Sequence, residues 1–335
     1  MKIGFFELEG WEESIVRTNF SDAELVFDKN KIDELNIPSV TDFDMISVFV
    51  DSRITKDIIA RFPNLKFIAT RSTGYDHIDV AACKERGITV AYVPGYGDNT
   101  VAEFAFGLLL SLTRKIYKGI DQVKESGSFA LDGMRGIDLN SKTIGVIGTG
   151  RIGKEVIKIA KGFGMNVVAF DKMPDNAYAA EMGVKYAATL EELLGNSDVI
   201  TIHCPLIPET THLINENNIK SIKRGAYFIN TARGGIVSTE ALISALNDGT
   251  IAGAALDVLE EEGDLQEELV FLSKGHPKEG ELQTLLDDHM LMKMPNVLVT
   301  PHMAFDSVEA LQRILNTTIS SVKGFISGTP INIVK

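Results

Sequence analysis

Three polar side chains, Arg233, Glu262 and His302, follow apolar runs that have the length of β-strands. The runs that precede them cover residues 226–231, 251–258 and 296–300. Ligands of open α/β sheets bind outside the carboxyl ends of the strands. If the runs are parallel strands of one sheet, the three side chains belong to a single site.

These residue types suit the reduction of a 2-keto acid or the reverse oxidation. The planar guanidinium of Arg233 can bind a carboxylate through two parallel hydrogen bonds while it polarises the neighbouring carbonyl. The imidazole of His302 can give and take a proton near neutral pH. A carboxylate such as Glu262 beside the ring would orient it and favour its charged form. We therefore expect Arg233 to bind substrate, His302 to exchange the proton and Glu262 to assist His302.

Each of these residues has a plainer interpretation when it is taken alone. An arginine after a strand is commonly an ion-pair residue, a glutamate in an acidic run is commonly solvated, and a histidine after proline commonly packs in a turn. Glu260 and Glu261 also compete with Glu262, because the three are adjacent. They open an acidic stretch that reaches Asp288 and that we expect to be mostly a solvated loop or a short helix. The occurrence of all three residue types after successive apolar runs favours catalysis.

A glycine-rich turn in mid-chain predicts a dinucleotide site. Gly148, Gly150 and Gly153 form the pattern GxGxxG, an apolar run precedes it at 143–147, and apolar residues continue at helical spacing through 152–163. Gly148 would make the tight turn, Gly150 would let the backbone approach a pyrophosphate, and Gly153 would allow close packing of helix on strand. The amides at the start of the helix would then bind the phosphates.

Asp171 favours NAD over NADP as the cofactor. It ends the apolar run 166–170, about twenty residues beyond the glycine pattern, where this fold places the acid that accepts hydrogen bonds from the adenosine ribose. A 2'-phosphate at that place would meet a carboxylate. Lys172 beside it could weaken the discrimination, and a lone aspartate could also be a simple turn residue.

Strand-like runs alternate with helical segments along the whole chain in two series. The first series covers residues 2–6, 45–50, 65–70 and 88–93, and the second covers 143–148, 166–170, 199–203, 226–231, 251–258 and 296–300. This alternation predicts two α/β domains with parallel sheets, whose strands are apolar on both faces. A helical pattern at 101–116 would connect the domains, residues 127–140 would form an exposed arm, and a last helix at 307–325 could fold back on the first domain.

Composition limits the class of protein. A chain of 335 residues is expected to form two domains. The net charge of -13 opposes binding to nucleic acid and to anionic membranes. The most apolar run, 104–110, is too short to span a membrane, the start turns acidic too early for a secretion signal, and Cys83 and Cys204 suggest no disulfide framework. The histidines show no metal-ligand spacing. We expect a cytoplasmic protein without a bound metal.

The sequence resembles the D-2-hydroxyacid dehydrogenases over nearly its whole length. The motifs that carry the resemblance occur in the family's order: GTGRIG at 148–153, HCPL followed by ETTHLI at 203–214, NTARG at 230–234, LDV with a later glutamate at 256–262, and TPHMAF at 300–305. Within the family the chain looks most like the D-lactate dehydrogenases. That similarity rests on RSTGYDHID at 71–79, VPGY at 93–96 and the HMAF ending of the last motif.

The resemblance implies a domain arrangement and further contacts. Residues 1–98 and 301–335 would form a substrate-binding domain, residues 99–300 an NAD-binding Rossmann domain, with a cleft between the two Rossmann-like or flavodoxin-like sheets. The implied cofactor contacts, besides the glycine turn and Asp171, are Arg151, Ile152, Cys204, Pro205, Thr210, Thr231, Ala232, Arg233 and, near the nicotinamide carboxamide, Asp257. Thr73 and Gly74 would bind the substrate carboxylate opposite Arg233, and Tyr96 and Phe305 would border the side-chain pocket. The family also implies a homodimer formed largely by the NAD domains.

The expected activity is therefore the NAD-dependent interconversion of pyruvate and D-lactate. Within the family, alternatives are a D-3-phosphoglycerate, glyoxylate or hydroxypyruvate reductase, or a dehydrogenase for a bulkier 2-hydroxy acid; Tyr96 and Phe305 offer no added cation for a phosphate. From another class, the chain could be a non-catalytic NAD-binding scaffold like the corepressors that resemble this family. One departure is the segment between Glu262 and Met294, which is longer than in the shorter family members.

Overall fold

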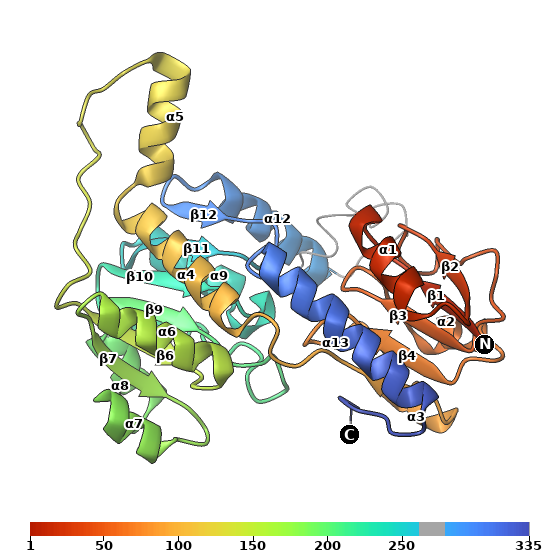
Figure 1. Cartoon of the computed structure of the whole chain (residues 1–335). Helices are drawn as coiled ribbons and strands as arrows, with labels where there is room; N and C mark the ends of the chain where they lie inside the picture. Colours follow the sequence, from red (N-terminus) through yellow and green to blue (C-terminus); the bar gives the residue numbers. More distant parts are fainter. Residues whose placement is uncertain (261–278, 335) are drawn as a thin grey trace. The chain divides into compact units, whose positions relative to one another are not determined.

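The computed structural model describes residues 1–260 and 279–334. The chain divides into two compact units (Figure 1). One unit contains Met1–Tyr96 together with Ser307–Lys335, and the other contains Gly97–Asp306. His302 and Phe305 thus belong to the second unit.

The first unit is built on a five-stranded parallel sheet with the order β2-β1-β3-β4-β5. Its strands are β1 (Lys2–Phe5), β2 (Glu24–Phe27), β3 (Met45–Val48), β4 (Phe67–Thr70) and β5 (Thr89–Ala91). Its helices are α1 (Gly10–Asn19), α2 (Lys56–Ala60), α3 (Val80–Glu85) and the last helix, α13 (Val308–Ile326). Helix α13 packs on β4, where the rings of Phe67 and Phe325 stack with their centroids 4.5 Å apart. The strand order is that of flavodoxin-like folds.

The second unit has a seven-stranded parallel sheet with the order β12-β11-β10-β9-β6-β7-β8. Its strands are β6 (Thr143–Ile147), β7 (Asn166–Phe170), β8 (Lys185–Tyr186), β9 (Val199–Ile202), β10 (Ala226–Asn230), β11 (Ile251–Leu256) and β12 (Val297–Val299). Read from β8 to β11, the order contains the Rossmann arrangement, in which the direction of strand addition reverses beside the first strand, β6. The predicted fold class, two parallel-sheet α/β domains, is confirmed.

Helices cover both faces of the second sheet. The helices of this unit are α4 (Asp98–Thr113), α5 (Ile116–Ser126), α6 (Arg151–Gly162), α7 (Asn176–Met182), α8 (Leu190–Asn196), α9 (Thr239–Asn247) and α12 (Glu279–Lys293), with short 3-10 turns at Ile219–Ser221 and Gly234–Ile236. One apolar cluster joins α4 and α6 to the sheet, and another joins α8 and α9 to it. Alternate residues of β6 enter the two clusters, as Val146 and Ile147 show. This double coverage explains why the strands are apolar along their whole length.

Three local features differ from the sequence-based expectation. The short edge strands β2 and β8 were not expected. The expected helix over 101–116 ends instead at Thr113, because Lys115 takes a left-handed backbone (φ 52°) and α5 starts after it in a new direction (Figure 1). The acidic segment before Asp288 was expected to be a solvated loop or a short helix, yet α12 extends over 15 residues and buries Leu285, Asp288 and Leu291.

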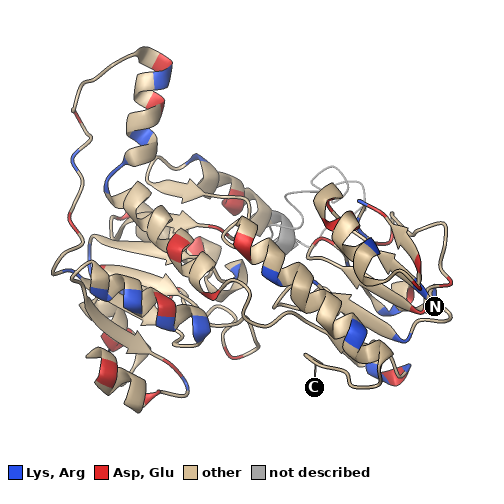
Figure 2. Cartoon of the chain, viewed as in Figure 1, with Lys and Arg blue, Asp and Glu red and all other residues tan. Residues whose placement is uncertain are grey.

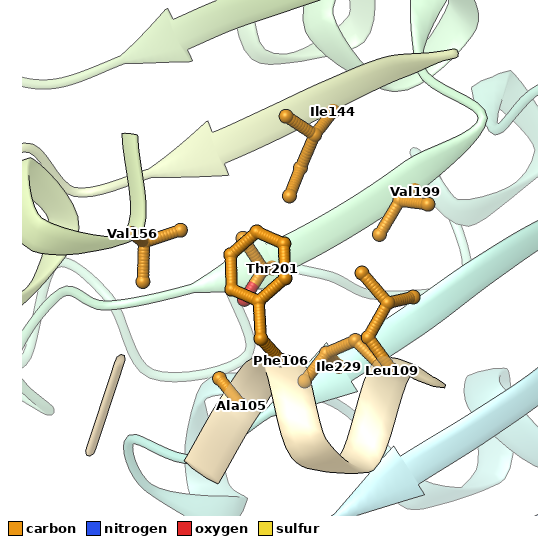
Figure 3. A pocket seen from close by; sticks show the side chains of 8 residues that line it. All are labelled: Ala105, Phe106, Leu109, Ile144, Val156, Val199, Thr201 and Ile229. Carbon is orange, nitrogen blue, oxygen red and sulfur yellow. The ribbon is translucent and has the colours of Figure 1, made fainter. Parts of the chain in front are cut away.

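The core of the second unit contains a small gap rather than a ligand cavity. Side chains of α4, α6 and the central strands line it, among them Phe106, Val156 and Thr201 (Figure 3). It has no room for a water-sized sphere. In the part of the chain that the structure describes, no helix is long and apolar enough to cross a membrane. Acidic and basic residues are interspersed along helices such as α5 and α6 (Figure 2).

Candidate active site

The carboxyl ends of the second sheet carry most of the residues that the sequence singles out. Because every strand pair is parallel, these ends meet at one edge. The residues that follow the strands there are Gly148 after β6, Asp171 after β7, Cys204 after β9, Thr231 after β10, Asp257 after β11 and His302 after β12. This edge, beside the reversal point at β6, is where ligands of such sheets bind.

The turn after β6 accepts only glycine at two of its positions. Gly148 has a left-handed φ of 91°, and a Cβ atom there would come within 2.6 Å of the Cys204 amide nitrogen. A Cβ atom at Gly153 would overlap the carbonyl oxygen of Gly148, so α6 could not approach β6 as closely as it does. Gly150 instead faces open space. The backbone is therefore bare where a pyrophosphate would approach.

Three features of this structure fit a bound dinucleotide. Helix α6 begins at Arg151 without a side-chain cap, so the amides of its first turn remain for phosphate oxygens. The hydroxyl of Thr231 is buried and has no hydrogen-bond partner in the described residues. The carboxylate of Asp171 stands at the end of β7, next to the glycine turn. These residues would hold the phosphates and the adenosine ribose.

The carboxylate of Asp171 is held by the glycine turn itself. Its Oδ2 accepts hydrogen bonds from the amide nitrogen of Thr149 (2.6 Å) and from the Thr149 hydroxyl (3.0 Å). Its Oδ1 accepts one from the amide nitrogen of Met173 (2.8 Å). Lys172, which could have favoured NADP, lies with its Nζ 3.9 Å from the carboxylate of Glu209.

Arg151 and Ile152 lie in the first turn of α6. The Nε of Arg151 pairs with the Oδ2 of Asp98 at 2.7 Å, which ties the start of α6 to the start of α4. Ile152 is half-buried against the cluster of α4 and α6. The side chain of Ile152 therefore contributes to packing as well as to the turn.

The loop after β9 is closed by its own hydrogen bonds. The hydroxyl of Thr210 donates to the carbonyl of Pro205 (2.6 Å) and accepts from the amide nitrogen of Ile207 (2.8 Å). Burial raises the pKa of the Cys204 thiol to about 11. The Cys204 thiol, which lies beside Gly148, therefore carries no charge near neutral pH.

Two residues that the sequence reasoning did not single out position Arg233. The buried side chain of Asn230 accepts a hydrogen bond from the amide nitrogen of Ala232 (3.0 Å) and donates one to the carbonyl of Arg233 (2.9 Å). A Cβ atom at Gly234 would overlap the backbone of Leu259, so the segments after β10 and β11 touch at this glycine. Both residues belong to the NTARG motif, which was the available signal. The guanidinium Nη1 of Arg233 donates to the carbonyl of Ala232 (2.7 Å).

Asp257 holds the loop that carries His302. Its fully buried carboxylate accepts hydrogen bonds from the Thr300 hydroxyl (2.5 Å) and from the amide nitrogens of Met303 (3.0 Å) and Ala304 (2.8 Å). Its backbone carbonyl accepts one from the amide nitrogen of His302 (2.9 Å). Burial raises the pKa of Asp257, and these hydrogen bonds act against the shift. His302 itself has a left-handed backbone with φ 51°.

One residue that the sequence places at the site is not among the described residues. Glu262 lies outside the described residues, and so does its neighbour Glu261. Glu260 is described, and its carboxylate contacts Nε2 of His212 at 2.5 Å and the hydroxyl of Thr239 at 2.9 Å. These contacts make Glu260 a structural residue between the loop after β9 and the start of α9.

The remaining substrate-binding candidates divide between the units. In the first unit, the Thr73 hydroxyl donates to the carbonyl of Val93 (2.7 Å), Gly74 follows it in the turn after β4, and the carbonyl of Tyr96 accepts from Nε of Arg313 (2.6 Å). In the second unit, Phe305 is half-buried at the end of the His302 loop. Among the described residues, no cluster of His, Cys, Asp or Glu side chains is arranged to hold a metal ion.

Comparison with known proteins gives a consistent result. Residues 106–304 match the model of the NAD-binding domain of D-isomer specific 2-hydroxyacid dehydrogenases. The chain is 37% identical to the D-lactate dehydrogenase of Escherichia coli, over 84% of this chain and 83% of that one. It is 38% identical to an aromatic 2-oxoacid reductase of Clostridium sporogenes, over 86% and 84% of the two chains.

Among solved structures, the chain is similar to the D-lactate dehydrogenase of Aquifex aeolicus, which was determined with NAD and lactic acid. The TM-score is 0.85 and the sequence identity is 36%, over 98% of this chain and 96% of that one. The similarity therefore includes both units and not the nucleotide-binding unit alone.

Proposed function

The chain belongs to the D-isomer specific 2-hydroxyacid dehydrogenases, and from this premise we propose that it is a D-lactate dehydrogenase, which reduces pyruvate to D-lactate with NADH and catalyses the reverse oxidation. The observation that carries the proposal is the placement of Arg233 and His302 after β10 and β12, at the carboxyl edge of the NAD-binding sheet. The D-lactate dehydrogenases among its relatives support pyruvate as the substrate.

The cofactor is NAD, since the family's NAD-binding domain covers residues 106–304. Bound NADH supplies the hydride that the keto carbon receives. In our proposal the turn from Gly148 to Gly153 binds the phosphates through backbone amides, and Asp171 accepts hydrogen bonds from the adenosine ribose. The buried hydroxyl of Thr231, which has no partner in the described residues, would gain one from the bound cofactor.

Arg233 binds the keto acid in this proposal. Its guanidinium can grip the carboxylate through two hydrogen bonds and draw electron density from the adjacent carbonyl. Asn230 and Gly234 support the role, because they fix the backbone of Arg233 next to the segment after β11. Thr73 and Gly74 would bind the same carboxylate.

His302 moves the proton. Its imidazolium donates a proton to the carbonyl oxygen during reduction, and the neutral ring removes the hydroxyl proton during oxidation. Asp257 supports this role by fixing the amides on the C-terminal side of His302. Glu262 is assigned the orientation of the ring, as in the sequence-based expectation.

The test of substrate is a panel of 2-keto acids: pyruvate, 2-oxobutyrate, 2-oxoisocaproate, hydroxypyruvate and phenylpyruvate. We expect kcat/KM, followed by loss of NADH absorbance, to be highest for pyruvate, and chiral chromatography to identify the product as D-lactate. A maximum at phenylpyruvate would replace the proposal with an activity like that of the C. sporogenes relative. Absence of turnover with every acid would leave only an NAD-binding scaffold.

A matched pair of arginine variants tests the binding role. Arg233→Lys is expected to raise KM for pyruvate at least tenfold and to lower kcat, because a single ammonium cannot reproduce the two-pronged contact. Arg224→Lys is the control, since Arg224 is exposed and its guanidinium donates a hydrogen bond to the carbonyl of Asp248, away from the strand ends that carry the site. Equal kinetic constants for both variants would remove Arg233 from the site.

A further inference from the structure

We propose that Tyr186 and Thr149 form a hydrogen-bond relay that fixes the carboxylate of Asp171 and so sets the preference of this chain for NAD over NADP. The inference rests on the proposed role of Asp171 at the adenosine ribose. Tyr186 and Thr149 are positioning residues here, because they act on the cofactor through Asp171.

All hydrogen bonds of the relay are donated in the same direction, toward Asp171. The Thr149 hydroxyl donates its single proton to Oδ2 of Asp171 at 3.0 Å. The contact of 2.8 Å between the Thr149 and Tyr186 hydroxyls then requires Tyr186 to be the donor. The Tyr186 hydroxyl in turn accepts from the amide nitrogen of Asp175 at 3.2 Å. Each donor thus points toward the carboxylate, and hydrogen bonds in such a series polarise and strengthen one another.

The far end of the relay is anchored. Asp175 caps α7, since its side chain accepts a hydrogen bond from the amide nitrogen of Tyr178 (3.0 Å). The other carboxylate oxygen of Asp175 pairs with Nζ of Lys154 on α6 at 2.7 Å. Tyr186 lies in the edge strand β8, whose only strand neighbour in the described sheet is β7. The relay therefore joins β8 and α7 to the glycine turn.

The relay leaves the carboxylate of Asp171 with one position that can accept a further hydrogen bond. A carboxylate has about four positions for hydrogen bonds. Thr149 takes two at Oδ2 and Met173 takes one at Oδ1, so within the described residues one position at Oδ1 remains. A ribose hydroxyl can donate to that position. A 2'-phosphate cannot donate, and it would place a second anion against a carboxylate that has no freedom to turn away.

Loss of the relay should therefore lower the selectivity for NADH over NADPH more than it lowers the stability of the fold. We measure dissociation constants of NADH and NADPH by isothermal titration calorimetry, with no keto acid present. Tyr186→Phe and Thr149→Val should each weaken NADH binding about two- to tenfold, the worth of one hydrogen bond. NADPH binding should change less or improve, so the ratio of the two constants narrows. Thr149→Ser, which keeps the hydroxyl, should restore the ratio.

A double-mutant cycle tests whether Tyr186 acts through Thr149. In the Thr149→Val background, Tyr186→Phe should not change the NADH constant further, because the relay is already broken. An effect of Tyr186→Phe that is as large in this background as in the parent protein would overturn the relay. An unchanged NADH-to-NADPH ratio in Tyr186→Phe would overturn it as well.

Two controls separate the possible failures. Tyr178→Phe removes a nearby hydroxyl that donates to the Lys154 carbonyl (2.9 Å) outside the relay, and it should leave both constants unchanged. Asp171→Ala should bring the dissociation constants of NADH and NADPH closer together than either relay variant does. If Asp171→Ala narrows it and Tyr186→Phe does not, the relay is wrong and the role of Asp171 stands. If Asp171→Ala has no effect, the ribose assignment fails and the relay fails with it.

Discussion

His302 combines a strained backbone with the position proposed for the proton donor. A left-handed φ costs free energy for any residue with a Cβ atom, and such residues gather at functional sites. The hydrogen bond from its amide to the Asp257 carbonyl keeps the backbone in this conformation. The fold thus fixes the backbone of His302 at the carboxyl edge of the sheet.

Replacement of His302 tests the proton transfer. His302→Gln is expected to lower kcat by about a hundredfold to ten-thousandfold, the usual worth of a positioned acid and base. The dissociation constant of NADH should stay within about twofold of the parent value, because the imidazole is not assigned to the cofactor. Steady-state kinetics and calorimetric titration measure the two quantities. A variant with near-normal kcat would place the proton donor elsewhere.

His203 is expected to make the stability of the fold sensitive to acid. Part of the residue reaches the surface, but its Nδ1 is buried without a hydrogen-bond partner in the described residues, and burial lowers the pKa of His203 to about 3. The unfolded chain therefore binds a proton at this residue near pH 6.5, before the folded chain does. The resulting stability is fully present above pH 6.5 and is lost as pH falls toward 3.

We therefore expect the free energy of unfolding of His203→Gln to fall less steeply with decreasing pH than that of the parent protein. Glutamine cannot titrate and can keep the contact with the Thr201 hydroxyl, which lies 2.7 Å from Nε2. The loss of unfolding free energy between pH 7 and pH 5 should shrink by up to about 2 kcal/mol, with partial exposure making this an upper value. Urea unfolding at the two pH values measures it. An unchanged loss would show that folding does not lower the pKa of His203.

At the scale of the element, the segment from β12 to α13 has few apolar anchors of its own. Ala304 is its one buried apolar residue, and the carboxylate of Asp257 accepts three hydrogen bonds from it. An asparagine keeps only one oxygen, so its NH2 group would face the amide of either Met303 or Ala304, which needs an acceptor. Leaving such donors unpaired costs about 1–3 kcal/mol.

Asp257→Asn should therefore loosen this loop. Amide hydrogen exchange at residues 302–304 is expected to accelerate about tenfold or more, and kcat should fall because His302 is no longer held. Exchange in β11 itself should change much less, since its ladder bonds to β10 remain. Unaltered protection at 302–304 would mean that the backbone geometry, and not the carboxylate, holds the loop.

At the scale of the whole molecule, the second unit exposes a projecting arm. Helix α5 and the segment 127–140 extend away from the sheet (Figure 1). Ile116, Ile120 and Val123 lie on one side of α5 at helical spacing and are about half exposed, and Phe129 and Leu131 are each 83% exposed. Apolar groups gathered in this way mark an interaction surface.

We expect this arm to be covered in a homodimer, as the family resemblance implies. Light scattering at micromolar concentration should give twice the chain mass, and Ile120→Asp should shift the mass toward the monomer. Leu35→Asp is the matched control, because it places the same charge at an exposed apolar site in the first unit and should not alter the mass. A monomeric parent protein would contradict the expectation.

The local pattern of residues determined the fold class and placed the candidate site residues after strands of the second sheet. Apolar runs that alternate with helical segments predict parallel sheets, and the glycine pattern with Asp171 after the next strand predicts the nucleotide site. Arg233 and His302 could be placed at the same sheet edge because each follows a strand. The edge strands β2 and β8 escaped prediction because they are short and only half-buried, and the helix break at Lys115 has no glycine or proline to mark it.

Only the tertiary structure decided how these residues are held. The Asp257 carboxylate reaches amides 46 and 47 residues along the chain, and Tyr186 reaches Thr149 across 37 residues. Gly234 is required by the backbone of Leu259 and Gly148 by that of Cys204. These contacts join residues of neighbouring strands or, for Tyr186 and Thr149, of strands separated by β7. The residues are distant in sequence, so no periodicity or local motif encodes the contacts. The chain's residues therefore specify which groups are present at the edge, and the order and register of the strands specify which of them meet.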